Sequence, residues 1–495
     1  MQEREAKLTV PVGFELPELG GPGDGFLAEP LAPRRLQTTY YDTPDLRLAR
    51  WGASLRHRPG EGWTVKLPEG QKGALLVRGE HVFHGEGRRP PAEALGLVRA
   101  FVRSAQLSPV VRMRTLRRPV ELRDQAGERL AELVDDEVQV LKGRRIAGRF
   151  RELEVELAEA ATPDLLERVL ERLRQAGAEA ADPTPKYLRA LGGPASLPGD
   201  ELERPEVDGG ASVAALLRYD LGEGTRRLFR HEAAVRIGED PEGIHQARVA
   251  TRRLRSTLRS FSSLLEPEWT DRLRGELKWL ADLLGAVRDA DVLLARFEGH
   301  LAALPAGDAR AGSRLLESLV ERREQDRGRL LAAMAEARYA TLLDDLVAAA
   351  ASPALLPGAE QPAAGVMPPL VAKPWRRLKQ TVKQAGSDPS DEQLHQIRIR
   401  AKRARYAAEA VVPVIGKPAQ QFAAAAADLQ DVLGEQHDAV VGEAWLREAA
   451  RSARRDQALL AGLLIAAERA TAARAREAWR PVWKALNRGK LRSWF

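Results

Sequence analysis

Residues 245–255 read His245-Gln-Ala-Arg-Val-Ala-Thr-Arg-Arg-Leu-Arg255, and residues 395–405 read His395-Gln-Ile-Arg-Ile-Arg-Ala-Lys-Arg-Ala-Arg405. Each stretch combines one histidine with cations at helical spacing. At about 100° per residue, these side chains fall on a single stripe of each helix. We call the two stripes the rails, and they consist of His245, Arg248, Arg252, Arg255 and Arg259 in the first copy and His395, Arg398, Lys402 and Arg405 in the second.

The opposite stripe of the first copy is apolar and predicts a core face. Its members are Ala247, Ala250, Leu254, Leu258 and Phe261. Like charges three or four positions apart on a helix repel by about a few tenths of a kcal/mol per pair. Because neither rail contains interleaved carboxylates, the pattern predicts that a polyanion supplies the countercharge. A solvated basic face is the alternative, and the repetition of the pattern disfavours it.

A second repeated signature follows each rail. It reads Leu284-Gly-Ala-Val-Arg-Asp-Ala in the first copy and Leu433-Gly-Glu-Gln-His-Asp-Ala in the second. Two signatures in the same order indicate an internal duplication of a multi-helix unit. We therefore expect the rails to be related by a pseudo-two-fold axis, which allows both to face one cleft.

The composition limits the class of protein. A chain of 495 residues is too long for a single core and predicts two or three domains. With 44% hydrophobic and 30% charged residues it reads as an ordinary soluble protein. We expect a cytoplasmic location without membrane insertion, because no apolar run approaches the roughly 20 residues of a membrane span and the first residues lack signal-peptide features. The absence of cysteine excludes disulfides and thiolate ligands.

The order of patterns along the chain predicts an α+β protein of two domains. Residues 1–190 hold short alternating segments separated by Gly and Pro, which is typical of antiparallel β-structure, and one helix around 163–177 interrupts them. From Ala211 onward the periodicity is helical, with one long breaker at Ser352–Pro369. The expected division is a β-rich domain at 1–191, a linker at 192–211 and an all-α domain at 212–486, whose halves lie at about 212–351 and 370–486.

Ionic faces recur along the strands of the first domain. Alternate residues share a face of a strand, so one face carries ions and the other carries aliphatic side chains such as Leu153 and Val155. Carboxylate pairs are hard oxygen ligands for Mg²⁺ or Mn²⁺, whereas Arg and Lys match phosphate oxygens. Both signs inside a closed sheet predict a polar tunnel for a metal–polyphosphate complex; the alternative is an amphipathic sheet with a salt-bridged solvent face.

These segments resemble the CYTH domain of the triphosphate tunnel metalloenzymes. The resemblance rests on Glu3-x-Glu5-x-Lys7 and on an ordered set that follows it: Tyr40-Tyr-Asp-Thr-Pro44, Leu55-Arg-x-Arg58, Trp63-Thr-Val-Lys66, Glu154-x-Glu156 and Lys186-Tyr-Leu-Arg-Ala-Leu191. It covers residues 1–191. It implies an eight-stranded antiparallel tunnel that hydrolyses or cyclises triphosphates with a divalent metal ion.

The resemblance also implies roles for single residues. Glu3, Glu5 and Lys7 are the expected catalytic residues, and the expected metal ligands are Glu3, Glu5, Glu154 and Glu156. The expected phosphate ligands in the tunnel are Lys7, Arg56, Arg58, Lys66, Arg112, Arg114, Lys186 and Arg189. Asp136 shares a strand face with Glu132, so we prefer it to Asp135 as a further metal ligand. Pro119 disturbs the alternation and leaves open whether Arg117 or Arg118 faces the tunnel.

Residues 212–486 resemble the CHAD domain, a helical domain named for conserved histidines and associated with inorganic polyphosphate. His245 and His395 with their rails carry this resemblance. A bound polyanion favours the imidazolium form of both histidines, and phosphate contact is a better interpretation than metal binding because no carboxylate stands at a suitable spacing.

The combined prediction is a protein that binds inorganic polyphosphate through its helical domain and hydrolyses triphosphate or polyphosphate in a tunnel dependent on Mg²⁺ or Mn²⁺. The main alternative is a non-catalytic protein that binds polyphosphate or is targeted to polyphosphate granules. A nucleotide cyclase is a weaker alternative, because nothing resembles a base-reading pocket. Nucleic-acid binding is disfavoured because the rails contain no aromatic residue before Tyr406 that could stack on bases.

Overall fold

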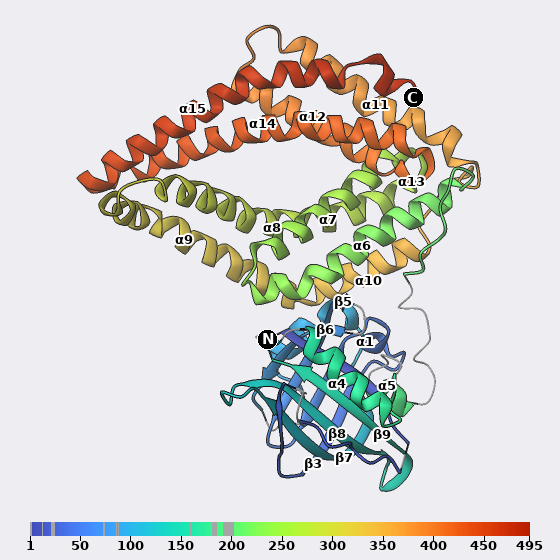
Figure 1. Ribbon diagram of the computed structural model, residues 1–495. Coiled ribbons are helices and arrows are strands. Elements are labelled where there is room, and N and C mark those ends of the chain that lie inside the picture. The colour runs from blue at the N-terminus through green and yellow to red at the C-terminus, as the bar shows by residue number, and fades with distance from the viewer. Residues whose placement is uncertain are drawn as a thin grey trace. The chain divides into compact units, whose positions relative to one another are not determined.

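The computed structural model divides into two compact units, Met1–Asp200 and Glu201–Phe495, each described below by itself (Figure 1). The structure describes residues 2–11, 13–20, 25–72, 75–85, 87, 89–158, 161, 163–180, 186–191 and 202–495; within these ranges it describes the backbone but not the side chains of 2–5, 69–72, 75–78, 163, 180 and 306. Residues 192–201 of the predicted linker and the side chains of Glu3 and Glu5 therefore lie outside the described part.

Antiparallel strands form the first unit. In its described residues they are β1 (Gln2–Thr9), β2 (Leu27–Pro30), β3 (Arg34–Asp42), β4 (Ser54–Arg58), β5 (Gly62–Lys72), β6 (Leu75–Phe83), β7 (Ser108–Arg123), β8 (Arg129–Lys142), β9 (Arg145–Leu157) and β10 (Glu179–Ala180). The strands pair in the order β1-β6-β5-β4-β3-β7-β8-β9, and β9 pairs back to β1. This closes eight strands into a ring and confirms the predicted eight-stranded antiparallel tunnel; β2 and β10 add to its margins.

The main apolar core of this unit lies outside the ring of strands. Short helices α1 (Arg47–Arg50), α2 (Ala92–Leu97) and α3 (Arg99–Val102) precede β7, and α4 (Pro163–Gln175) follows β9. Leu165, Val169 and Leu173 of α4 pack with Leu153 and Val155 of β9 in one buried cluster. Because the aliphatic face of the sheet is covered by α4, the ionic face must line the inside of the ring.

A smaller apolar cluster fills part of the interior. Tyr187 and Leu188 of helix α5 (Lys186–Leu191) pack against Tyr40, Val111 and Met113 on the inner face of the sheet. The Tyr187 hydroxyl donates to the carbonyl of Ala53 at 2.8 Å, which fixes α5 against β4. The residue that begins α5, Lys186, is thereby placed inside the ring.

Long helices form the second unit. They are α6 (Val213–Ile237), α7 (Pro241–Ser260), α8 (Pro267–Leu301), α9 (Ala306–Ala335) and α10 (Ala337–Ala351), followed by α11 (Ala363–Gln384), α12 (Asp391–Glu409), α13 (Val412–Ile415), α14 (Lys417–Ala449) and α15 (Arg455–Leu486). The first group runs from green to yellow and the second from orange to red in Figure 1. Helices α6–α7–α8 and α11–α12–α14 pack in the same sequence, and α7 contacts α12 across the two halves.

Both rail helices begin at strong caps. Asp240 accepts a hydrogen bond from the Glu242 amide at 2.8 Å, and Ser390 forms a reciprocal capping box with Gln393. The predicted apolar stripe of α7 is buried, from Ala247 to Phe261. The second half begins earlier than predicted, because α11 starts at Ala363 and continues through Pro368 and Pro369. Burial of Met367 and Val371 on either side keeps this segment helical although two backbone donors are missing.

Candidate functional sites in the tunnel and between the rail helices

The ring of strands encloses a polar cavity of about 350 Å³. Residues from all parts of the sheet and from α5 line it: Lys7, Arg34, Leu36, Tyr40, Ser54, Arg56, Arg58, Glu61, Lys66, Glu80, Arg117, Glu132, Val134, Glu154, Glu156, Lys186 and Tyr187. Among the residues predicted for the tunnel, Lys7, Arg56, Arg58, Lys66, Lys186, Glu154 and Glu156 meet here.

Glu154 is the centre of a buried charge network. Its carboxylate receives Lys7 Nζ at 2.5 Å and Lys186 Nζ at 3.0 Å, and Arg117 approaches it at 3.6 Å. Burial would raise the pKa of Glu154, but the charges of Lys186, Lys7 and Arg117 hold it well below its usual range. Glu154 is therefore a charged group held by cations from β1, β7 and α5.

Asp136 joins the same network from β8. Arg117 binds it through two nitrogens at 2.9 and 2.6 Å, and Lys186 also contacts it. Burial raises the pKa of Asp136, and the opposing charges of Lys186 and Arg117 lower it below its usual value. Asp135 points the other way and pairs with Arg151 at 2.7 and 2.8 Å. The geometry thus places Asp136 and Arg117 on the inner face, whereas Arg118 pairs with Glu137 at 3.2 Å on the opposite face.

Cations dominate the part of the cavity next to β4 and β5. Glu80 accepts from Arg56 at 3.2 Å and lies 3.3 Å from Lys66, so it orients both. Arg58 donates to Thr38 at 3.0 Å, and burial followed by the charge of Arg56 lowers its pKa. Guanidinium and ammonium groups that lie close together in this way match the oxygens of a phosphate chain.

Tyr40 stands at the inner limit of this cationic region. Its ring stacks on Tyr187 with centroids 4.9 Å apart. Burial raises the pKa of the Tyr40 phenol, but the nearby charges of Arg56 and Arg58 outweigh burial and lower it. The phenol is therefore an unusually acidic hydrogen-bond donor, aimed into a positive environment.

Three glutamates lie in one row across adjacent strands. Glu5 of β1 is the register partner of Glu156 of β9, which in turn is the partner of Glu132 of β8. Like charges directly opposite one another destabilise a sheet unless a cation compensates them. Arg129 contacts Glu132 at 2.6 Å. Within the described residues no cluster of three His, Asp or Glu side chains has the geometry of a metal site, but this donor set suits a hard divalent cation.

Two of the predicted phosphate ligands lie outside the tunnel. Arg112 and Arg114 are exposed on β7, and neither lines the cavity. The prediction was wrong because it took the ionic face as the inner face along the whole of β7. Near α5 the inner face is apolar, and Val111 and Met113 occupy it. The sequence pattern missed Arg34, which lines the cavity and is the register partner of Arg117.

Arg189 is a third departure from the predicted set. It does not line the cavity but donates to Glu152 at 3.2 Å and to Thr9 at 2.7 Å, with its guanidinium over the Phe150 ring. Glu152 also lies 3.1 Å from Lys186. Arg189 is placed to support the charge network rather than to contact a molecule in the cavity.

In the helical unit, cations from both rails meet in a cleft of about 240 Å³ between α7 and α12. We call it the rail cleft, and it is lined by Arg252, Arg255, Ser256, Arg259, Ile399, Lys402, Arg403 and Tyr406. The rails thus share one cleft, to which the first contributes three arginines and the second contributes Lys402. Arg403, which lies beside the second rail, was not predicted.

The rail cleft is strongly positive. Lys402 is half-buried and lies close to Arg398, Arg252 and Arg248. Its pKa falls to about 7, first through partial burial and then through these charges. Burial and the charge of Arg403 lower the pKa of Arg259 to about 10. Charges that depress one another in this way are relieved by a polyanion.

Other rail residues lie beside the cleft and pair with acids from neighbouring helices. Arg248 contacts Asp289 at 3.0 Å and Arg398 approaches Asp438 at 4.0 Å. These two aspartates occupy the same place in the two copies of the second repeated signature, so the signature orients one arginine of each rail. Its repetition in the sequence was the signal that could have identified Asp289 and Asp438.

The two rail histidines have different surroundings. His395 Nδ1 lies 3.1 Å from Nδ1 of His437, and burial followed by the neighbouring His395 lowers the pKa of His437 to about 4. His245 instead lies near Arg288, the counterpart of His437, and burial with this charge lowers its pKa. Neither rail histidine lines the cleft, and Arg405 is also outside it, paired with Glu409 at 2.7 Å.

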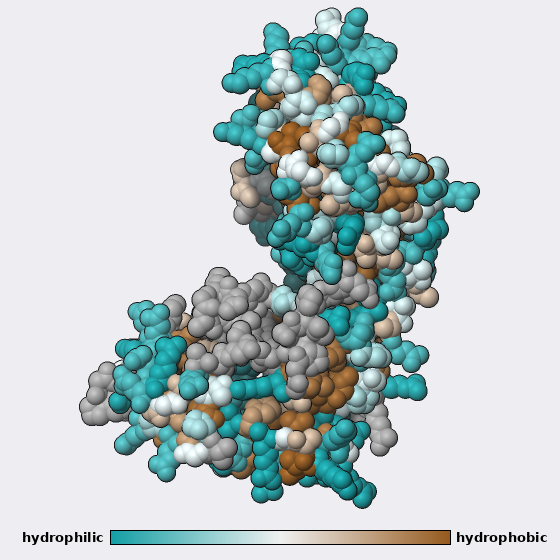
Figure 2. Space-filling model, turned by 90° about the vertical axis from the view of Figure 1, so that its right-hand side faces the viewer, coloured by the Kyte–Doolittle hydropathy of each residue, from teal (hydrophilic) through white to brown (hydrophobic). Residues whose placement is uncertain are grey.

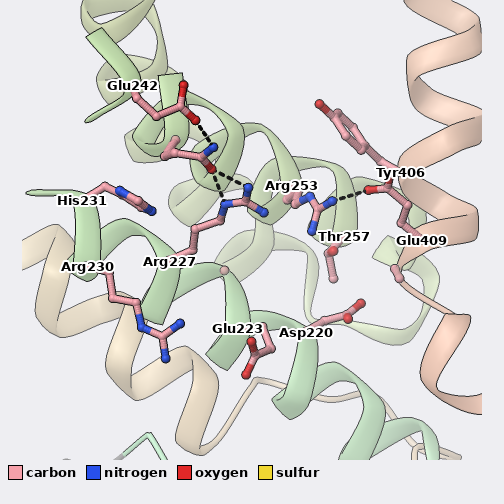
Figure 3. Close-up of a pocket in the computed structure, with 13 residues that line it drawn as sticks. Asp220, Glu223, Arg227, Arg230, His231, Glu242, Arg253, Thr257, Tyr406 and Glu409 are labelled. Atoms are coloured by element: carbon pink, nitrogen blue, oxygen red, sulfur yellow. Dashed lines mark hydrogen bonds and ion pairs between the residues drawn. The ribbon is translucent and has the colours of Figure 1, made fainter. Parts of the chain in front are cut away.

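A second cavity, of about 460 Å³, shares Tyr406 with the rail cleft as a lining residue. Figure 3 shows this second cavity. Its walls come from α6, α7 and the end of α12: Asp220, Glu223, Gly224, Arg227, Arg230, His231, Glu242, Gln246, Arg253, Thr257, Tyr406, Glu409 and Ala410. Arg253 pairs with Glu409 at 2.8 Å. Burial raises the pKa of Asp220 well above its usual value. Both acidic and basic residues line this cavity, whereas every charged residue that lines the rail cleft is a cation.

No described helix is long and apolar enough to cross a bilayer. On the face shown in Figure 2, hydrophilic residues cover most of the area and hydrophobic residues form separate patches.

Comparisons with known proteins assign both units. Models of the CYTH domain and of the CHAD domain match residues 1–188 and 220–447. The uncharacterized protein Rv2226 of Mycobacterium tuberculosis (strain ATCC 25618 / H37Rv) is 32% identical over 507 residues, which cover 96% of this chain and 94% of that protein.

Two solved structures are similar to parts of the chain. PptA from Streptomyces chartreusis is 25% identical, covers 55% of this chain and 100% of its own, and gives a TM-score of 0.46. The CHAD domain from the plant Ricinus communis is 28% identical, covers 58% of this chain and 95% of its own, and gives a TM-score of 0.48.

Proposed function

This chain belongs to the family of proteins in which a CYTH domain, with its triphosphate tunnel fold, is followed by a CHAD domain, and we propose that it binds inorganic polyphosphate and hydrolyses triphosphate or polyphosphate. The observation that carries the first part is the convergence of Arg252, Arg259 and Lys402, from two separate halves, on one cleft. A linear polyanion satisfies several such cations at once. The shortage of aromatic residues in this cleft favours a bare phosphate chain over a nucleic acid.

The hydrolytic part of the proposal rests on the division of charge inside the tunnel. Arg56, Arg58 and Lys66 provide donors for phosphate oxygens on one side, and the row of Glu5, Glu156 and Glu132 lies across β1, β9 and β8. This row would hold Mg²⁺ or Mn²⁺, which when bound neutralises charge on the phosphates and on the group being transferred.

The remaining chemistry belongs to the side chains of the chain itself. The β4 and β5 cations bind and orient the phosphates, which supplies most of the catalysis in phosphoryl transfer. Lys186 and Arg117 hold Asp136 and Glu154 ionised, so these carboxylates can accept a hydrogen bond from a water molecule beside the chain. The apolar plug of Tyr187 and Leu188 excludes bulk water from the inner part of the ring.

The test is phosphate release from tripolyphosphate, ATP and long-chain polyphosphate across a titration of Mg²⁺ and of Mn²⁺. Glu156→Gln should lose most activity and regain part of it at high metal concentration, because it removes one carboxylate from the proposed site. Lys7→Ala should weaken substrate binding with little change in the metal requirement. Glu137→Gln, on the exposed face of β8, is the matched control.

Activity that needs no metal, or that survives in Glu156→Gln, would refute the hydrolytic part. A protein that binds polyphosphate without releasing phosphate would instead support the alternative of a non-catalytic polyphosphate-binding or granule-targeted protein.

A further inference from the structure

The duplication makes the two ends of the α7–α12 contact directly comparable. In the alignment that places His245 on His395, Arg253 corresponds to Arg403 and Arg259 corresponds to Glu409. The same pair of positions therefore meets twice, once as Arg253 with Glu409 and once as Arg403 with Arg259. In an unbroken duplication both ends would carry the same charge, but here they do not.

At one end a carboxylate compensates part of the positive charge. Glu409 forms an ion pair with Arg253 at 2.8 Å and accepts a hydrogen bond from Arg405 at 2.7 Å. Asp220 faces the same cavity, and its raised pKa reflects burial close to Glu223 and Glu409. At this end of the α7–α12 contact, an approaching anion therefore meets carboxylates and a guanidinium group, Arg253, that is already in an ion pair.

At the other end the charge is uncompensated. Within the described part of the chain, no ion pair is formed by Arg259, Arg403 or Arg400. Burial and the adjacent charges of Arg403, Arg274 and Arg255 lower the pKa of Arg259 to about 10. An anion at this end relieves the repulsion among groups that have no carboxylate partner of their own.

The side chains that line the rail cleft also differ between its two ends. Ser256 and Tyr406 correspond in the alignment, and both line the rail cleft. Tyr406 is also a wall of the neighbouring cavity, where Arg253 and Glu409 are found (Figure 3). A small serine therefore lines the cleft one helical turn from Arg259, whereas the equivalent position one turn from Glu409 carries a large aromatic side chain that lines both cavities.

We propose that a polyphosphate chain is anchored at the Arg259–Arg403 end of the rail cleft and that Tyr406 and Glu409 end its path, so the duplicated fold binds its ligand asymmetrically. The proposal rests on the proposed function, namely polyphosphate binding by the helical unit. It makes Glu409 a residue that sets how much of the chain is bound, by keeping Arg253 and Arg405 occupied.

The first test compares the equivalent residues Arg403 and Arg253 in the full-length protein. Dissociation constants for long-chain polyphosphate are measured at graded salt for wild type, Arg403→Gln and Arg253→Gln. Arg403→Gln should weaken binding and reduce the log–log salt slope by about 0.7, the contribution of one cation to a single-stranded polyanion. Arg253→Gln should leave both unchanged, because Glu409 already neutralises Arg253 and keeps Arg405 as a partner.

Equal losses in the two variants would overturn the asymmetry and leave polyphosphate binding intact. If wild type itself does not bind polyphosphate, the proposed function fails, and the inference fails with it. The two failures are therefore distinguishable from the same titrations.

The second test removes the carboxylate. Glu409→Gln preserves shape and releases Arg253 and Arg405, so it should raise affinity and steepen the salt slope by about 0.7 to 1.4, one or two additional cations. The same variant should also require a longer polyphosphate to reach its full affinity, measured with chains of graded length. Unchanged or weaker binding by a Glu409→Gln protein with a wild-type thermal unfolding profile would overturn the proposal.

Discussion

Reversing two charges in the rail cleft should abolish most of the salt dependence of polyphosphate binding. The double substitution Arg252→Glu and Lys402→Glu changes one cation from each rail. Five cations line the cleft, namely Arg252, Arg255, Arg259, Lys402 and Arg403. With a contribution of about 0.7 per neutralised phosphate, the logarithm of the wild-type affinity should fall against the logarithm of salt with a slope of about −3.5.

The substitution removes two positive charges and adds two negative ones. Only about one net cation then remains in the cleft, and the expected slope is about −0.7. Between about 50 and 200 mM salt, wild type should lose about a hundredfold in affinity and the variant only about threefold. At low salt the variant should also bind far more weakly, because most of the favourable electrostatic free energy of binding has been removed.

The measurement is fluorescence anisotropy of end-labelled long-chain polyphosphate, with circular dichroism to show that helical content is retained. Fold should survive because Arg248 and Arg398 lie close to Lys402 and can compensate the new carboxylates. Arg451→Glu with Lys484→Glu, both exposed and outside the cleft, is the control with the same change in net charge. A wild-type slope in the Arg252→Glu/Lys402→Glu protein would show that polyphosphate does not occupy this cleft.

Two further predictions follow from the electrostatics and from the faces of β7. The pKa of Lys402 is lowered to about 7 in the free protein, so this charge is present below pH 7 and lost above it; bound phosphate raises the pKa again. The affinity for polyphosphate should therefore fall as the pH rises above about 7. Binding should also take up protons, which calorimetry in buffers of different ionisation enthalpy measures. The substitution Lys402→Arg should abolish both effects. In the tunnel, Arg58→Gln should weaken tripolyphosphate binding in an equilibrium assay, whereas Arg112→Gln and Arg114→Gln should not. Weaker tripolyphosphate binding by either of the last two variants would contradict the outward placement of these arginines.

The architecture was predictable because its periodicities are uninterrupted over long segments. The alternation around Glu154 and Val155 indicated a sheet with one ionic face, and the apolar stripe from Ala247 to Phe261 indicated a buried helix face. The ring closure itself came from the family resemblance, since no local pattern reveals that β9 pairs with β1. Pairing between distant strands depends on the whole sheet.

Individual site residues were less predictable where the environment changes along a single element. Arg112 and Arg117 belong to the same strand, but α5 makes the inner face apolar near Arg112 and leaves it polar near Arg117. Alternation specifies that two residues share a face and does not specify which face is inward. Pro119 also disturbs the alternation, so the sequence left open whether Arg117 or Arg118 faces the tunnel. The hydrogen bonds from Arg117 to Asp136 place Arg117 inside.

The charges that compensate the rails show the same dependence on tertiary structure. Neither rail stripe contains interleaved carboxylates, and the sequence therefore suggested that an external polyanion supplies the countercharge. Asp289 of α8 and Asp438 of α14 supply part of it for Arg248 and Arg398. These aspartates hold Arg248 and Arg398 in place. Among the residues that the structure describes, the five cations that line the rail cleft form no ion pair.

The charge asymmetry of this unit therefore depends on where the duplication has been kept and where it has been lost. The kept pairs, Arg248 with Asp289 and Arg398 with Asp438, give both halves an arginine that faces an aspartate of the next long helix. The lost equivalence between Arg259 and Glu409 changes the charge of one end of the contact by two units, which in a partly buried cleft outweighs the few tenths of a kcal/mol of a surface helix pair. One substitution at a duplicated position is thus enough to make the two ends of the α7–α12 contact electrostatically different.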